Sequence, residues 1–409
     1  MIFNTPWFLL FALLVYPVFF LIPSNRARFY FMLAACAVFH GHFAGAAGVI
    51  PIIIMGVITY GFALLLGQTR FTETFGKNRR RVWTALALAV PVGGLIFYKY
   101  RYFLFSALTF LPADKRLALE PWFKLGPMPL AISFFTFEFV HYLTDVIRGD
   151  RPIKNFWQFS FFSIFFPSIV SGPIKRFQNF IPQISAGLPR PSAEDLLKGS
   201  GQVVLGFSKK LIIADNAYLT VQLLERRACW DFYSVTLLIL LLSVRILFDF
   251  SGYSDMAIGL ARMLGIRLPV NFNFPYLARN ISDFWNRWHI SLSSWIRDYL
   301  YIPLGGGRVP PWRKLLNLAT VMALCGLWHG AAWHFLIWGV YQGLGLGLHA
   351  FYERSLKPEA ATSLWGLKLP AIPSIMSHAL TLVFVGYGWI LFFYPLSQAF
   401  SLTARWWVF

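Results

Sequence analysis

Two histidines stand in the most polar parts of an otherwise apolar chain. His289 lies in the run Asn273–Gly307, which is polar, charged and rich in tryptophan, and His329 follows forty residues later in Leu327–Gly330. A histidine has an ordinary pKa of about 6.5, so its neutral imidazole can take the proton of a hydroxyl group. Polar groups are costly in a membrane and need partners there, which makes such polar islands candidate functional sites.

The alternative to catalysis is a structural role. A buried histidine such as His329, taken alone, is more often a hydrogen-bonded structural residue, and it is the second histidine, His289, that favours chemistry. His329 and His334 are five residues apart and would point to different faces of a helix, so a zinc site is not expected. The other histidines are interpreted as structural or interfacial (His40 and His42) or have no supporting pattern (His141, His349 and His378).

A helix predicted over Asn280–Leu300 would position His289. Asn280 has the residue type of an N-cap, and Asp283 would place an acidic side chain in the first turn. Asp283 and Arg287 are four residues apart and can form an ion pair on one face.

Hydrophobic residues cover most of the circumference of this predicted helix. It would therefore be buried on several sides or lie at the membrane interface, where Trp285 and Trp288 would fit an aromatic belt. His289 and Ser293 would share another face of the helix.

The segment Ile302–Arg308 cannot continue a helix because it contains a proline and three consecutive glycines. Glycines allow a ligand to approach the backbone closely, and backbone groups there could contact phosphate with help from Arg308. A plain flexible loop is the alternative, and the glycines alone favour it.

The chain as a whole has the composition of a polytopic membrane protein. Its 409 residues are 57% hydrophobic and only 13% charged, with a mean hydropathy of +0.58, whereas soluble domains have about 25% charged residues. About 20 apolar residues cross the hydrocarbon core, and this criterion predicts roughly nine to twelve spans or half-spans. The apolar runs are Trp7–Ile22, Phe29–His40, Ala47–Leu66, Val82–Tyr98, Pro127–Ile147, Phe159–Val170, Gln202–Leu223, Tyr233–Phe248, Leu315–Ile337, Trp338–Tyr352 and Ile375–Tyr394.

The net charge of +19 comes from 36 basic and 17 acidic residues. The basic residues sit in short loops between apolar runs, which favours cytoplasmic loops and anionic lipid head groups over nucleic acid. The loop Arg70–Arg81 is predicted to be cytoplasmic. If Val82–Tyr98 is one full span, the basic loop Lys99–Lys124 lies on the opposite side, and a re-entrant hairpin is the alternative.

Other sequence signals limit the function. Cys36, Cys229 and Cys325 are scattered, which predicts neither a disulfide nor a zinc site, and no metal or permanently bound cofactor is expected. Motifs for ATP binding and for a serine nucleophile are not found.

Ile2–Pro23 is predicted to be a retained first span. The loop Ser185–Asp195 is the best candidate for a hinge and is not interpreted as a domain boundary.

Three stretches around the histidines are distinctive: DFWNRWH at Asp283–His289, RDYLYIPLGG at Arg297–Gly306 and LWHG at Leu327–Gly330. Together they resemble the membrane-bound O-acyltransferase family. YIPLGG is most similar to its bacterial alginate and exopolysaccharide O-acetyltransferase branch. The resemblance covers about residues 125–350, and further matching stretches are Pro129–Phe137, Phe165–Pro167, Gly172–Ile174 and Phe248–Ala257.

The resemblance implies an all-α fold in which a ring of tilted transmembrane and re-entrant helices surrounds a central tunnel. The chain would form a single membrane-embedded domain over 1–409, with N-terminal helices in 1–125, a catalytic core over about 125–350 and C-terminal helices in 351–409. The family's membrane-embedded histidine maps onto His329, and the histidine that precedes it maps onto His289.

The resemblance also implies the reaction. Acetyl-CoA would enter the tunnel from the cytoplasm as the acyl donor, and the acetyl group would pass to an acceptor at the outer face of a bacterial inner membrane. A periplasmic acetyltransferase and the polysaccharide-synthesis machinery are the expected partners.

The predicted site therefore has two tiers. His329 is expected to be the general base or to orient the acceptor, and His289 is expected to assist it. Arg287, Arg297 and Arg308 are expected to steer the phosphates of coenzyme A, and the tryptophans to shape a dry tunnel in which electrostatic interactions are strong. The full tunnel set is Asn286, Arg287, Trp288, Ser293, Trp295, Arg297, Asp298, Tyr299, Arg308, Asp249, Tyr253, Asp255 and Trp328.

The chain departs from the family pattern at three positions, which bear on the acceptor or partner surface more than on the chemistry. Ala131 stands where the family commonly has glycine, Glu138 where it has glutamine and Tyr394 where it has arginine. Two alternatives stay open. One is D-alanyl or other acyl transfer to cell-wall polymers, although the YIPLGG stretch favours the polysaccharide branch. The other is a non-catalytic channel that moves an acylated carrier.

Overall fold

The computed structural model describes residues 2–109, 112–124, 128–227, 229–356 and 372–407. Within these ranges every regular element is a helix, which confirms the predicted all-α class. The chain divides into two compact units, Met1–Leu205 with Tyr253–Pro269 (unit 1) and Gly206–Gly252 with Val270–Phe409 (unit 2). Two divisions fall inside α9 and α11 and the third lies between Pro269 and Val270, after α11, so none falls in the loop Ser185–Asp195, which belongs to unit 1. The single domain over 1–409 stays a prediction.

Four helical segments among the described residues are long and apolar enough to cross a membrane. Two belong to the N-terminal half of the chain, one joins the two units and one lies near the C-terminus, as a multi-pass membrane protein requires. They are Asn25–Leu66, Gly76–Ser106, Phe232–Arg262 and Ser374–Phe393.

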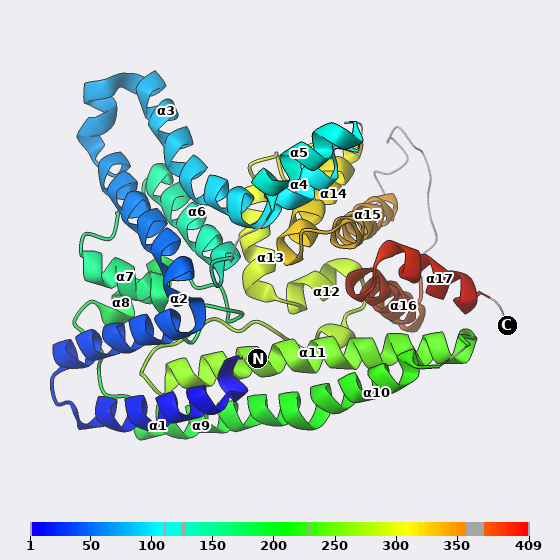
Figure 1. Cartoon of the computed structure of the whole chain (residues 1–409), viewed down its shortest axis with the longest axis horizontal. Helices are drawn as coiled ribbons and strands as arrows, with labels where there is room; N and C mark the ends of the chain where they lie inside the picture. The colour runs from blue at the N-terminus through cyan, green and yellow to red at the C-terminus, as the bar shows by residue number, and fades with distance from the viewer. Residues whose placement is uncertain (1, 110–111, 125–127, 228, 357–371, 408–409) are drawn as a thin grey trace. The chain divides into compact units, whose positions relative to one another are not determined.

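Unit 1 is built mainly from the N-terminal helices, of which α2, α3 and α6 pack side by side in Figure 1. The two apolar runs predicted between Phe29 and Leu66 form one helix, α2, which is kinked at Gly45, where the backbone φ is 63°. The elements of unit 1 are η1 (Ile2–Asn4), α1 (Pro6–Leu21), α2 (Asn25–Leu66), α3 (Thr69–Leu95), η2 (Ile96–Tyr100), α4 (Arg101–Ser106), α5 (Ala113–Phe123), α6 (Ile132–Arg148), α7 (Phe156–Ile164), α8 (Phe177–Ile184) and most of α9 (Ala193–Ser208).

Two of the departures from the family pattern have a visible structural role in unit 1. Ala131, directly before α6, has φ 59° and ψ 21°, a left-handed conformation that glycine adopts without steric cost. Glu138 forms a buried ion pair with Lys175, whose ammonium also lies 4.8 Å from the ring centre of Phe162. The acidic side chain therefore neutralises a lysine that the fold buries.

Unit 2 carries both candidate histidines. In it, α10 and the first part of α11 lie side by side, and Arg245 of α11 stacks 4.2 Å from the ring centre of Tyr218 of α10. Tyr394, the third departure, donates a 2.5 Å hydrogen bond to Glu225. The elements are η3 (Lys209–Ala214), α10 (Asp215–Glu225), α11 (Phe232–Arg262), which ends in unit 1, η4 (Pro275–Leu277), α12 (Ile281–Arg287), α13 (Ile290–Ile296), η5 (Arg297–Tyr301), α14 (Pro311–His329), α15 (Trp333–Ser355), α16 (Ser374–Phe393) and α17 (Leu396–Trp406).

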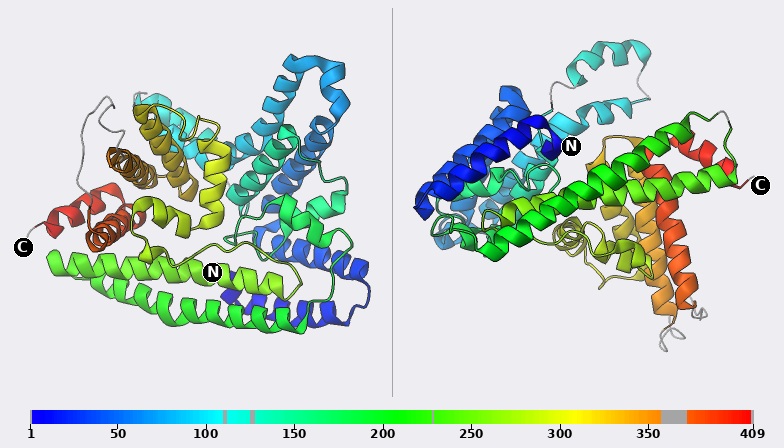
Figure 2. Two further views of the ribbon diagram at one scale, coloured as in Figure 1. Left: turned by 180° about the vertical axis from the view of Figure 1, so that it is seen from behind. Right: turned by 90° about the horizontal axis from the view of Figure 1, so that it is seen from below.

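The helices α14 and α15 form a tight hairpin in unit 2, and α16 runs beside α15 (Figure 2). Small residues allow the close approach of α14 and α15, because a Cβ added at Gly339 would lie 2.1 Å from the carbonyl oxygen of Met322. The predicted single run Leu315–Ile337 is wrong, since α14 ends at His329 and Gly330 is extended. The ring of Phe335 lies 2.1 Å from where a Cβ of Gly330 would stand, so a glycine is needed at this break.

Candidate functional site

The helix predicted over Asn280–Leu300 is broken beside His289. Helix α12 ends at Arg287, α13 begins at Ile290, and the last part is the π-helical turn η5. His289 itself has φ 42° and ψ 55°, a left-handed conformation that costs a residue with a side chain about 1–2 kcal/mol. Strain of this kind persists only where the surrounding structure imposes it.

A segment from earlier in the chain imposes this break. The backbone N–H of Asn273 donates to the carbonyl of Arg287 at 2.9 Å, and the N–H of Ile290 donates to the carbonyl of Asn271 at 2.9 Å. Backbone groups that a continuous helix would pair internally are thus paired with the segment 271–273 instead.

The local features predicted for α12 are confirmed. The side-chain oxygen of Asn280 accepts a 2.7 Å hydrogen bond from the N–H of Asp283, as an N-cap does. The guanidinium of Arg287 is 2.7 Å from the carboxylate of Asp283. Arg287 is thereby held beside its own helix.

His289 is fully buried and is fixed by the carboxamide of Asn271. Its Nδ1 lies 3.1 Å from Oδ1 of Asn271, and the ring of Phe250 meets the imidazole edge to face at a centroid distance of 4.6 Å. Burial, and after it the nearby His329, lower the pKa of His289 well below its ordinary value. The lowered pKa favours the neutral imidazole, in which one ring nitrogen keeps an unprotonated lone pair.

His329 ends α14 and completes an aromatic cage around the two histidines. Its ring centre lies 4.6 Å from that of Trp328, which is itself 6.1 Å from that of His289. Trp338 and Phe392 meet the ring of His329 edge to face, at 5.4 and 5.1 Å. His329 is half-buried, so it is the more accessible of the two histidines.

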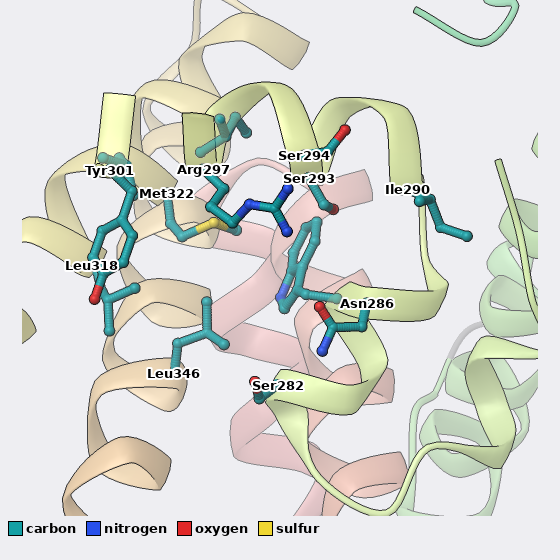
Figure 3. A pocket seen from close by; sticks show the side chains of 13 residues that line it. Ser282, Asn286, Ile290, Ser293, Ser294, Arg297, Tyr301, Leu318, Met322 and Leu346 are labelled. Carbon is teal, nitrogen blue, oxygen red and sulfur yellow. The ribbon is translucent and has the colours of Figure 1, made fainter. Parts of the chain in front are cut away.

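A cavity of about 310 Å³ opens beside α12 and α13 in the same unit. Figure 3 shows it between these helices, η5, α14 and α15. Neither histidine is among the described residues that line it. Its polar lining is Ser282, Asn286, Ser293, Ser294, Arg297 and Tyr301, and its apolar lining is Trp285, Ile290, Ile296, Leu318, Val321, Met322 and Leu346.

The predicted tunnel residues separate into groups. Asn286, Ser293 and Arg297 line the cavity together. Trp288 and Trp328 belong to the aromatic cluster around the histidines. His289 and Ser293 do not share one face of a continuous helix, because His289 stands before the first turn of α13.

The other predicted residues are not among the described residues that line this cavity. Trp295 and Tyr299 are buried and contact each other, Asp298 pairs with Arg297, Arg308 is exposed and Asp249 pairs with Lys210. Tyr253 and Asp255 belong to unit 1, where Tyr253 stacks on Phe3 and Asp255 accepts a hydrogen bond from Gln202.

The interfacial belt predicted for Trp285 and Trp288 is wrong. Their exposed fractions are 7% and 4%, and both indoles pack inside unit 2. Trp285 contacts Trp338 of α15, and Trp288 contacts Trp389 of α16. Aromatic residues from later helices thus cover the side of α12 that the sequence alone assigned to the interface.

Asn271 is the site residue that the sequence reasoning missed. It lies two residues before the predicted polar run begins at Asn273, and no helical spacing relates it to His289. A signal was available in the asparagines at positions 271 and 273. A buried histidine needs a hydrogen-bond partner, and these were polar side chains close to the predicted site.

Comparison with known proteins identifies the family that this sequence resembles. The sequence model of the membrane-bound O-acyltransferase family matches residues 98–365, which include both histidines and the cavity. The chain is 33% identical to a protein of Pseudomonas aeruginosa named probable alginate O-acetylase, over 99% of this chain and 74% of that one. It is 31% identical to the peptidoglycan O-acetyltransferase of Helicobacter pylori, over 83% and 66%.

A third relative has a different printed activity. The teichoic acid D-alanyltransferase of Bacillus subtilis is 31% identical, over 64% of this chain and 68% of that one. These matches define the class of enzyme as an O-acyltransferase. The chain belongs to the membrane-bound O-acyltransferase family. The predicted resemblance is confirmed, and the matched region extends beyond the predicted 125–350 on both sides.

Proposed function

We propose that this enzyme takes an acetyl group from cytoplasmic acetyl-CoA and passes it across a bacterial inner membrane for O-acetylation of an extracytoplasmic polysaccharide. Two relatives named as alginate O-acetylases match 99% of this chain at 33% and 34% identity, and three more match 76%, 76% and 68% of it. The relative named as a teichoic acid D-alanyltransferase matches only 64% of it. This difference in coverage favours acetyl transfer to a polysaccharide.

The observation that carries the chemistry is the pair of histidines in one aromatic cage. His329 is the more accessible histidine and takes the proton of the acceptor hydroxyl, while the buried, neutral His289 assists within the cage. The hydroxyl oxygen attacks the thioester carbonyl carbon and forms the new C–O bond. The C–S bond breaks, and the sulfur leaves with the bonding electrons and receives the proton from the imidazolium. An ester and a free thiol result.

The cavity beside α12 and α13 suits part of the donor. Its hydroxyl groups, the amide of Asn286 and the guanidinium of Arg297 can bind amides and phosphates, and its other wall is apolar. A volume of about 310 Å³ is at the lower end of the range of ligand pockets. It would hold a section of the coenzyme A arm and not the whole molecule.

The alternative donor is a D-alanyl or other acyl thioester, with a cell-wall polymer as acceptor. Its support is the 31% identity to a teichoic acid D-alanyltransferase. For the polysaccharide function, a periplasmic acetyltransferase would receive the acetyl group and act with the polymer-synthesis machinery.

The experiment measures release of coenzyme A and transfer of radiolabelled acetyl groups in membranes that carry the wild-type chain or His329→Ala. His349→Ala is a matched control, because this histidine pairs with Glu353 near the other end of α15. We expect His329→Ala to lower acetyl transfer at least about a hundredfold and the control to retain it. Retention of transfer by His329→Ala at equal expression would contradict the proposed catalysis and favour the channel alternative. Use of D-alanyl thioester with no use of acetyl-CoA would favour the alternative donor.

A further inference from the structure

The carboxamide of Asn271 is buried and holds its oxygen toward α13. Asn271 is 1% exposed, and its Oδ1 lies 3.2 Å from the backbone nitrogen of Ser291 and 2.8 Å from Oγ of Ser291. A backbone N–H can only donate, so the carboxamide atom that faces it must be the oxygen and not the nitrogen. The orientation of this side chain is therefore determined by its partners.

The orientation of Asn271 determines the tautomer of His289. Nδ1 of His289 is 3.1 Å from the same oxygen, and a carboxamide oxygen can only accept, so Nδ1 must carry the proton. In a neutral imidazole, Nε2 then has a lone pair and no proton. This nitrogen is buried and makes no hydrogen bond to any residue that the structure describes.

The position of the imidazole is fixed as firmly as its tautomer. The backbone carbonyl of Asn271 accepts from the N–H of Ile290, so one asparagine holds the chain directly after His289 through both its backbone and its side chain. Phe250 packs edge to face against the ring, and Phe272 lies parallel to it at a centroid distance of 6.5 Å. These contacts explain why His289 keeps a left-handed backbone conformation.

We propose that Asn271 is a positioning residue, which holds His289 in the Nδ1–H tautomer so that Nε2 can take over the proton that His329 removes from the acceptor hydroxyl, before that proton passes to the leaving sulfur. The inference rests on the proposed function and assigns part of its proton handling to His289. It differs from a purely structural cap of α13, because a cap needs only an acceptor for the backbone N–H groups. If Asn271 also sets the tautomer, its loss would let the proton of His289 move from Nδ1 to Nε2, even where the histidine itself stays in place.

The first experiment compares Asn271→Ala and Asn271→Asp by steady-state kinetics in the full chain. We expect Asn271→Ala to lower kcat about 10–100-fold and to leave KM for acetyl-CoA within about twofold, as loss of a partner that orients a histidine does elsewhere. Asn271→Asp keeps an oxygen acceptor and should recover most of this loss. Asn317→Ala is the control, because Asn317 is also buried in unit 2 and donates to the carbonyl of Leu304, away from the histidines.

The pH profile separates positioning from simple capping. A carboxylate at position 271 would favour the imidazolium form of His289, so Asn271→Asp should move the acid limb of kcat to higher pH. His329 on α14 is the titratable group whose charge acts on His289, and Phe250, Phe272 and Trp288 bring no charge to it. An unchanged acid limb, or equal losses in both variants with normal melting temperatures, would overturn the proposal.

A second measurement keeps the proposal testable if Asn271→Ala does not fold. Nitrogen NMR of the wild-type chain with ¹⁵N-labelled histidine reports which ring nitrogen carries the proton, and His289→Gln identifies the signal. We expect a protonated Nδ1 and an unprotonated Nε2 for His289, and the opposite tautomer would refute the inference. If His289→Gln and His329→Ala both retain transfer, the proposed function fails. If they lose it while Asn271→Ala does not, only the positioning role fails.

Discussion

Glu138 of α6 and Lys175 form an ion pair whose side chains keep only 9% and 2% of their surface exposed. Removing one partner of a buried pair leaves the other charge without compensation, which costs about 3–5 kcal/mol. We expect Lys175→Ala and Glu138→Ala each to lower the melting temperature strongly. The double substitution Glu138→Gln with Lys175→Met removes both charges and should recover most of the stability. A double variant no more stable than the single variants would contradict this account.

Ala131 is a second site where sequence and conformation conflict. Its φ of 59° costs a side-chain-bearing residue about 1–2 kcal/mol, and glycine would remove this cost. Glycine also gives the unfolded chain more conformational freedom, which offsets part of this gain in stability. We therefore expect Ala131→Gly to stabilise the protein by up to about 1 kcal/mol. Ala404→Gly in the exposed part of α17 should instead destabilise it, because glycine is a poor helix former. Thermal unfolding in detergent measures both, and a lower melting temperature for Ala131→Gly would refute the argument.

Arg297 offers a test of the cavity as the donor site. Its side chain lines the cavity but is 60% exposed, so it can contact a phosphate at the cavity mouth. We expect Arg297→Ala to raise KM for acetyl-CoA about tenfold and to change kcat less than threefold, since it would weaken binding and not the chemical step. Met322→Trp, which fills the apolar wall, should also raise KM. An unchanged KM in both variants would place donor binding elsewhere.

The lowered pKa of His289 predicts a pH dependence of stability. In the unfolded chain this imidazole takes up a proton as the pH falls below about 6.5, whereas the folded state resists protonation until a lower pH. The free energy of unfolding should therefore fall by up to about 1.4 kcal/mol per pH unit below about pH 6.5, until the lowered pKa is reached. Melting temperatures of wild type and His289→Gln between pH 7 and pH 5 check this. Parallel curves for the two proteins would contradict it.

The sequence predicted those features of the site that depend on near neighbours. The N-cap at Asn280 and the ion pair of Asp283 with Arg287 need only the spacing of a helical turn, and both are present. The break at His289 depends on hydrogen bonds from Asn271, which lies 18 residues away, so a pattern of local spacing continues the helix through it. Helical periodicity contains no information about a partner that caps from a distance.

The sequence predicted the segments that form the site better than it predicted which side chains meet there. Asn286, Ser293 and Arg297 come from one predicted helix, and they do line one cavity. Trp285 and Trp288 were assigned to an interface because tryptophan favours that position, but helices α15 and α16 cover them. Tyr253 and Asp255 follow Asp249 closely in the sequence, yet the compact units separate within α11 between these positions. Family motifs locate conserved segments, but only packing decides which of their side chains share a site.

The aromatic cage around His329 is completed by residues that come late in the chain. Both histidines are synthesised before Phe392, which packs against His329 and belongs to the last turn of α16. A chain that has been synthesised only as far as both histidines therefore lacks one wall of the aromatic cage. On the proposed mechanism, the dry centre that protects the acyl group from water would therefore form only after α16 has been inserted.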